Sequence, residues 1–222
     1  MAAGESDSLK TDWRAQRRAG AAAIAVSAIV SAALWLGIRY FAPAIAGMDG
    51  VSSRMLFTLK CLCVAVLFCF ATGIDAVAHE RLQSPAFDPL GGFETHRLRI
   101  NLRYLQNTLE QLMMLVVALF GLTAYCPDGE AMRAVEATTL VWILGRLAFW
   151  AGYHRSASMR AMGASSIALS LLVLIYVVGR VGYDAGGAIG AIVLVGIFLV
   201  FEAFLFRATR GFSAAAGTDV EH

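Results

Sequence analysis

The sequence predicts an all-α protein that crosses a membrane several times, and three observations support this. Of the 222 residues, 59% are hydrophobic and 15% are charged, whereas soluble domains contain about 45–50% and about 25%. The mean hydropathy of +0.67 is more than one soluble core can bury. Six apolar stretches each approach the roughly 20 residues that a helix needs to cross a bilayer. This composition excludes an ordinary cytosolic enzyme, a disordered chain and a nucleic-acid-binding protein.

Turn-forming residues separate the six stretches, which indicates that each stretch is a separate helix. The stretches cover residues 20–41, 55–78, 98–125, 134–153, 163–178 and 188–206. The separators are Pro43, Gly47 and Gly50, then Pro85, Pro89, Gly91 and Gly92, then Pro127 and Gly129, then Gly179 and Gly182. We therefore expect a transmembrane helical bundle with six spans.

The first stretch has a second interpretation, a cleaved signal peptide, because the small residues Ala44-Ile45-Ala46 follow it. However, its apolar run of about 20 residues is longer than a typical signal-peptide core, and a long polar segment precedes it. We expect a retained helix. Cleavage would leave the orientation of the other five helices unchanged.

Lysine and arginine predict the orientation, because they accumulate on the cytoplasmic side of membrane proteins. Twelve of the 18 lie on one side of the predicted bundle, and four lie on the other. The twelve fall in the N-terminal segment, around the loops that follow the second and fourth stretches, and in the C-terminal tail. We expect both termini in the cytoplasm. The net charge of +2 indicates no polyanionic partner.

Two groups of polar residues lie within the third and fourth stretches, where charged groups are costly. Arg103, Asn107 and Glu110 share one helix face within about 10 Å along the axis. Arg146 and Tyr153 are seven residues apart and also share a face. Because the two helices run in opposite directions, Glu110 and Arg146 reach equal depth, and we expect them to pair. The pattern leaves open whether the group is a structural link or a functional site.

The segment after the fourth stretch, residues 152–160, contains Tyr153, Arg155 and Arg160. Such residues at a membrane boundary often extend to lipid headgroups and orient the helix. They can also form an anion or thiolate site, since an arginine beside a thiol lowers the pKa of the thiol and favours the nucleophilic thiolate. Both interpretations remain open at this point.

Together these residues resemble the MAPEG superfamily, the membrane-associated proteins in eicosanoid and glutathione metabolism. Members share an Arg-x-x-x-Asn-x-x-Glu motif at the start of one helix, here Arg103, Asn107 and Glu110. The next helix carries an Arg and, seven residues on, a Tyr, as Arg146 and Tyr153 do. The segment after it is most similar to the cysteinyl-leukotriene synthases, in which an arginine follows the tyrosine by seven residues.

The resemblance implies a four-helix unit over residues 55–180 that assembles as a homotrimer, with glutathione as co-substrate between neighbouring subunits. It implies that glutathione is held by Arg103, Asn107, Glu110 and Tyr153, supported by Arg146, and that Arg160 is the catalytic residue that stabilises the thiolate. The co-substrate would be lipophilic or electrophilic, and no metal is implied. Residues 19–54 and 181–206 would be additions to this unit, with residues 1–18 and 207–222 as cytoplasmic ends.

Two functions are therefore expected from the sequence. The first is a membrane glutathione-dependent transferase or peroxidase. The second is a non-catalytic lipid-binding or scaffold protein of the same fold that keeps the polar residues for a ligand or for assembly. A small transporter is less favoured, because the sequence shows no inverted repeat and no helix interrupted at mid-membrane.

Overall fold

The computed structural model describes residues 2–156 and 159–218, and these residues contain helices and no strand. Five of the helices are long and apolar enough to cross a membrane by length and composition: Ala15–Phe41, Val51–Leu82, His96–Ala124, Gly129–Arg155 and Met159–Thr209. The expected all-α, multi-pass membrane architecture is therefore confirmed at this level.

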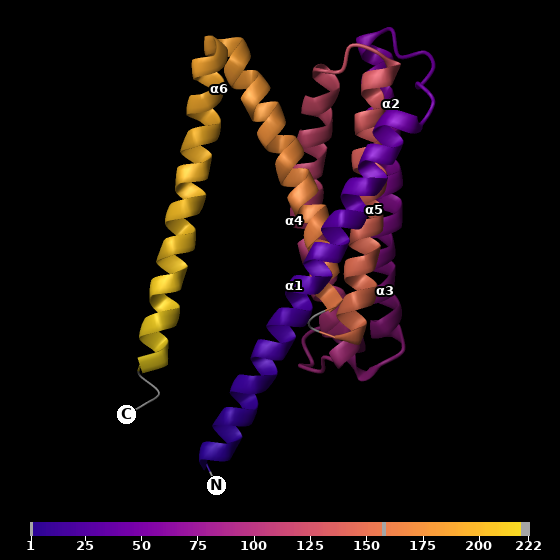
Figure 1. Cartoon of the computed structure of the whole chain (residues 1–222). Helices are drawn as coiled ribbons and strands as arrows, with labels where there is room; N and C mark the ends of the chain where they lie inside the picture. The colour runs from indigo at the N-terminus through magenta and orange to yellow at the C-terminus, as the bar shows by residue number, and fades with distance from the viewer. Residues whose placement is uncertain (1, 157–158, 219–222) are drawn as a thin grey trace. The chain divides into compact units, whose positions relative to one another are not determined.

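The elements follow one another with short connections (Figure 1). In chain order they are α1 (Ala2–Phe41), α2 (Val51–Ala65), the π-helix η1 (Val66–Ala71), α3 (Thr72–Leu82), the 3₁₀ helix η2 (Pro85–Phe87), α4 (His96–Ala124), α5 (Gly129–Arg155), the 3₁₀ helix η3 (Met159–Gly163) and α6 (Ala164–Thr218). The predicted stretch over residues 55–78 is thus a continuous helical segment whose middle turn is π-helical. Side-chain caps begin α4 and α5, where Thr95 Oγ1 accepts from Leu98 N and Asp128 Oδ1 accepts from Ala131 N.

The last two apolar stretches of the sequence fall in α6, which is helical on both sides of a kink. The backbone leaves helical geometry at Gly186 and Gly187, and Gly187 has φ +60°, a conformation that favours glycine. The chain reverses direction at this kink (Figure 1). Beyond residue 174 the chain forms a compact unit of its own. Within it the two arms meet at Gly182 and Gly190, because a Cβ at either glycine would overlap the backbone of the other.

In the first unit, α1, α2 and α4 pack against α5, and α3 packs on α4. Figure 1 shows α1 crossing the other helices obliquely. Hydroxyl groups connect these helices in the core. Thr58 Oγ1 and Thr123 Oγ1, both buried, lie 2.6 Å apart and join α2 to α4. Side-chain hydrogen bonds of this kind hold helices together in a bilayer, where lipid tails are as apolar as the helix surfaces.

The centre of the first unit holds a buried arginine. Arg146 on α5 is 0% exposed, and its Nη2 donates to Thr108 Oγ1 on α4 at 2.8 Å. The guanidinium carbon lies 4.4 Å from the ring centroid of Phe149 and 5.3 Å from that of Tyr104. The hydroxyl of Tyr104 donates to the carbonyl oxygen of Cys69 in the π-helix at 3.0 Å. One cation therefore links α5, α4 and η1.

Substitutions of Arg146 should separate the contribution of its charge to stability from the contribution of its planar shape. Arg146→Lys should lower the free energy of unfolding by about 2 kcal/mol, because a compact ammonium cannot stack on Phe149 and also reach Thr108. Arg146→Met should be more stable than Arg146→Lys, because it fills a similar volume and removes a buried cation. Denaturant unfolding in detergent measures both, and a lysine variant as stable as the parent would contradict this account.

Candidate functional site

A cavity of about 420 Å³ opens at the end of the bundle where α4 begins and α5 ends. Three elements supply its walls: the first two turns of α4, the last turn of α5 with the residue after it, and η3. The lining residues are His96, Arg99, Ile100, Arg103, Tyr153, His154, Arg155, Ser156 and Arg160. We call this space the basic cavity.

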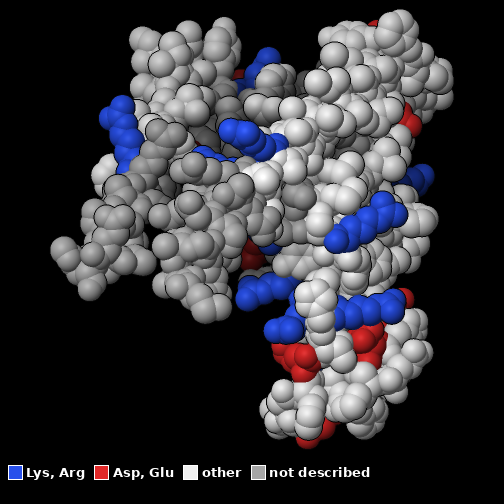
Figure 2. Space-filling model, turned by 60° about the horizontal axis from the view of Figure 1, so that its bottom comes forward, with Lys and Arg blue, Asp and Glu red and all other residues white. Residues whose placement is uncertain are grey.

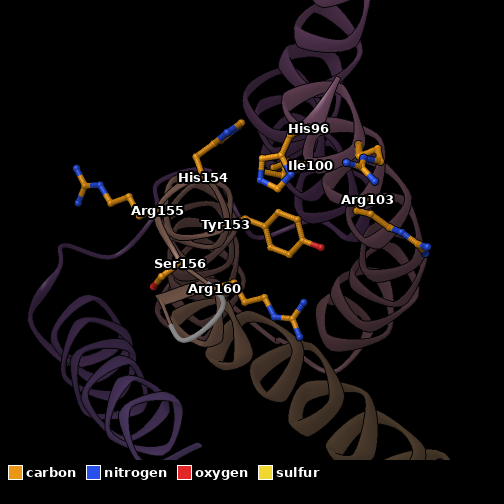
Figure 3. A pocket seen from close by; sticks show the side chains of 9 residues that line it. His96, Ile100, Arg103, Tyr153, His154, Arg155, Ser156 and Arg160 are labelled. Carbon is orange, nitrogen blue, oxygen red and sulfur yellow. The ribbon is translucent and has the colours of Figure 1, made fainter. Parts of the chain in front are cut away.

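The structure brings Arg103, Tyr153 and Arg160 together in this cavity, although Arg103 is 50 residues or more from the other two in sequence. Figure 3 shows the Tyr153 ring and the Arg160 side chain extending from α5 and η3 toward the space beside α4, with Arg103 on the opposite wall. The guanidinium carbon of Arg160 lies 5.6 Å from the Tyr153 ring centroid. The Arg155 side chain points away from this group (Figure 3).

Among the described residues, those that line the basic cavity carry cationic groups and no carboxylate. Four arginines and two histidines line it, with one tyrosine hydroxyl and one serine hydroxyl. The nearby carboxylate of Glu80 is engaged, since Arg97 pairs with it at 3.5 Å and the Thr95 hydroxyl donates to it at 3.0 Å. Figure 2 turns this end of the molecule forward and shows Lys and Arg side chains exposed there, with acidic side chains grouped toward one edge. The cavity is therefore suited to an anion.

The short helix η3 is placed by close contact with α5. A Cβ on Gly152 would overlap the backbone of Met159 and Arg160, and a Cβ on Gly163 would overlap the Phe149 side chain. The backbone of η3 is also fixed at its start, since Met159 N donates to Ser156 Oγ and Arg160 N donates to Ser156 O, each at 3.2 Å. Glycine at these two positions is what lets Arg160 approach Tyr153.

Asn107 and Glu110 lie outside the basic cavity, on an exposed face of α4. Asn107 Nδ2 donates to the carbonyl oxygen of Arg103 at 2.8 Å, and Glu110 Oε1 accepts from Gln106 Nε2 at 3.3 Å. The face of α4 that packs inside the first unit is a different one. It carries the buried polar residues Asn101, Thr108 and Gln111 beside Tyr104.

The expected pairing of Glu110 with Arg146 is wrong. Arg146 points into the core toward Thr108 and the two aromatic rings, whereas Glu110 points out of the unit. The reason is angular. Residues 108 and 110 differ by about 200° around a helix of 3.6 residues per turn, so equal depth does not place them on the same side of α4. Arg146 supports the site from behind, because its Phe149 partner lies 5.5 Å from the Tyr153 ring, measured between ring centroids.

Sequence reasoning missed several residues of the basic cavity. His96 and Arg99 precede Arg103 by seven and four residues, the spacing of one helix face, and this signal was available in the sequence. His154 could not be found in this way, because its place depends on a contact of its ring Nε2 with Asn101 Oδ1 at 3.1 Å. Trp150 Nε1 donates to the same oxygen at 3.0 Å.

No family model, curated protein or solved structure matches the chain. The MAPEG resemblance therefore stays a prediction that rests on the residues described above. Among the residues that the structure describes, no three His, Cys, Asp or Glu side chains are grouped in a way that could hold a metal ion.

The contact between Gly152 and η3 predicts a position-specific effect of a methyl group. Gly152→Ala should lower the free energy of unfolding by about 1–3 kcal/mol, because the added Cβ forces η3 away from α5. Gly37→Ala on α1 is the control, since nothing lies within 4 Å of its Cβ position and alanine favours a helix. Thermal or denaturant unfolding of both variants checks this, and equal effects would contradict the role given to Gly152.

Proposed function

We propose that the chain is an integral membrane protein that binds glutathione in the basic cavity. There the glutathione sulfur would bond to a lipophilic or electrophilic co-substrate, or two glutathione molecules would be oxidised to the disulfide while a peroxide is reduced. The observation that carries the proposal is that Arg103, Tyr153 and Arg160 line one cavity, whose described lining residues include no carboxylate.

The chemistry of glutathione suits this cavity. The tripeptide has two carboxylates, which guanidinium groups bind by paired hydrogen bonds. Arg103 supplies one such group from α4. Arg160 and the hydroxyl of Tyr153 provide a cation and a hydrogen-bond donor on the opposite wall, where a bound thiol would be held as the reactive thiolate.

The outward face of α4 supports assembly into the homotrimer that the resemblance implies. Glu110 lies 14 residues before the end of α4, about 21 Å along the axis, and so falls within a hydrocarbon core about 30 Å thick. A carboxylate at that depth is costly when it faces lipid. A neighbouring subunit would cover it, and Asn107 and Glu110 would then bind the part of glutathione that reaches the subunit boundary.

Binding should be measured first, by calorimetric titration of glutathione into the detergent-purified protein. Arg103→Gln should weaken binding about tenfold or more, equivalent to about 1.4 kcal/mol, because a charge-assisted contact is lost. Arg39→Gln is the control, since Arg39 contacts the first turn of α5 at the other end of that helix. Glu110→Gln tests the outward face. Absence of heat in the parent protein would reject the proposal.

Turnover separates the enzyme from the non-catalytic alternative. With a chloronitrobenzene electrophile or an organic hydroperoxide, Arg160→Ala should lower kcat more than it raises KM, because thiolate stabilisation acts on the reacting atoms. Arg39→Ala is the control, since Arg39 contacts the first turn of α5, at the end of that helix opposite the basic cavity. Equal effects of the two variants would remove Arg160 from the chemistry.

The lipid-binding alternative has an observation of its own. A second cavity of about 310 Å³ lies between α1 and the first turns of α6, and its lining is almost entirely apolar. Small side chains such as Ala28, Ala32 and Ala168 leave this space open. Glutathione binding without turnover, together with co-purified lipid, would favour this function.

We also propose six spans with both termini in the cytoplasm, the two arms of α6 being the fifth and sixth. Each arm is long enough to cross a bilayer, and the reversal at Gly187 returns the chain to the side it left. Alkaline phosphatase fused after residue 218 in a bacterial host should be inactive, and fused within residues 185–188 it should be active. An active C-terminal fusion would indicate five spans.

A further inference from the structure

The helix α1, which the four-helix plan does not include, has one buried residue among those whose side chains are described, and that residue is polar. Among the α1 residues whose side chains are described, 15–41, only Ser27 is buried, with 9% exposure. Most of its neighbours on the helix are apolar and face outward. Burying a hydroxyl costs free energy unless the hydroxyl forms a hydrogen bond, so a buried serine in an apolar helix indicates a specific partner.

The partner of Ser27 is the segment that carries Arg160. Ser27 Oγ donates to the carbonyl oxygen of Met162 in η3, and it lies 2.7 Å from Ser165 Oγ in the first turn of α6. Seven residues earlier on the same face of α1, the Cβ position of Gly20 lies 3.9 Å from the Cβ of Ala161. The contact therefore extends along η3 and reaches the residue next to Arg160.

Two helices thus hold η3 from two directions. On one side α5 contacts it at Gly152, against the backbone of Met159 and Arg160. On the other side α1 contacts it at Ser27 and Gly20. Because η3 is a short 3₁₀ helix, its own hydrogen bonds fix it weakly, and its position depends on these neighbours.

We infer that Ser27 of α1 is a positioning residue that sets the place of η3 and, through it, the guanidinium of Arg160 beside Tyr153. The role of Arg160 toward a thiol rests on the proposed function; the placement of its side chain by α1 does not. The additional helix thereby becomes part of the site without lining it.

The contacts of α1 can be tested separately from one another. Trp35 Nε1 donates to Thr138 Oγ1 on α5 at 3.0 Å, two turns of α1 away from Ser27. Ser31, one turn after Ser27, faces the two apolar cavities beside α1. Trp35→Phe thus loosens α1 elsewhere, and Ser31→Ala removes a hydroxyl while the Ser27 hydrogen bond to Met162 stays in place.

The first test follows the placement of residue 160 itself and needs no glutathione. In an Arg160→Cys background, the rate of modification by a charged methanethiosulfonate reagent is read by peptide mass spectrometry at position 160. Ser27→Ala and Ser27→Val should change that rate threefold or more, whereas Ser27→Thr, which keeps the hydroxyl at nearly the volume of valine, should stay within twofold of the parent. Ser31→Ala should also stay within twofold.

Two outcomes would overturn the inference. One is an unchanged rate in both Ser27→Ala and Ser27→Val. The other is an effect of Trp35→Phe as large as that of Ser27→Ala, which would show that general loosening of α1 is sufficient. The Ser27→Thr and Ser27→Val pair keeps the test decisive if Ser27→Ala folds poorly.

A second test links the placement to the site. With Arg160 intact, Ser27→Val should weaken glutathione binding or lower turnover threefold or more relative to Ser27→Thr. Equal binding and turnover in the pair would overturn the link between α1 and the site. If neither the parent protein nor any variant binds glutathione, the proposed function is wrong. The modification rates at position 160 then still decide whether α1 positions η3.

Discussion

The contacts of the Arg146 guanidinium are the interaction on which the rest of the first unit depends. They join α5 to α4 through Thr108, and they hold the rings of Tyr104 and Phe149, of which Tyr104 reaches the π-helix and Phe149 packs behind Tyr153. A desolvated cation gains strongly from aromatic faces, because their quadrupoles replace part of its lost hydration. The contacts of Arg146 in the core of the first unit therefore fix the helix ends that form the basic cavity.

The polar and charged side chains of the first unit lie in two different environments. Inside the first unit, buried hydroxyls and the guanidinium of Arg146 make short contacts between helices, such as that of Ser166 Oγ with Gln111 Oε1 at 3.1 Å. At the end of the bundle where α4 begins, exposed arginines line the basic cavity. The first group stabilises the fold, because few alternatives to these contacts exist in a bilayer. The arginines of the basic cavity are available to bind a ligand, because their guanidinium groups do not hold the helices together.

Much of this could be predicted from the sequence, and what could not has a physical reason. Length and hydropathy predict the helices. The family resemblance implied that Arg103, Tyr153 and Arg160 act at one site, and the structure places all three in the lining of the basic cavity. The sequence could not predict which face of α4 packs against the other helices. Periodicity indicates which residues share a face, but not which neighbour that face contacts. The predicted pairing of Glu110 with Arg146 was wrong for this reason. The role of Ser27 could not be predicted, because a lone serine in an apolar helix forms no periodic pattern with other polar residues.

The π-helix over residues 66–71 has a consequence for reading this chain against any relative. A π-turn contains one residue more than an α-turn, so the residues of α3 are rotated by about 100° relative to an uninterrupted α-helix. Gly73 owes its place under the Tyr104 ring to that rotation, with its Cβ position 3.0 Å from Cε1. Against a protein whose corresponding helix has no π-turn, an alignment without a one-residue gap here would pair Gly73 with a residue on another side of the helix.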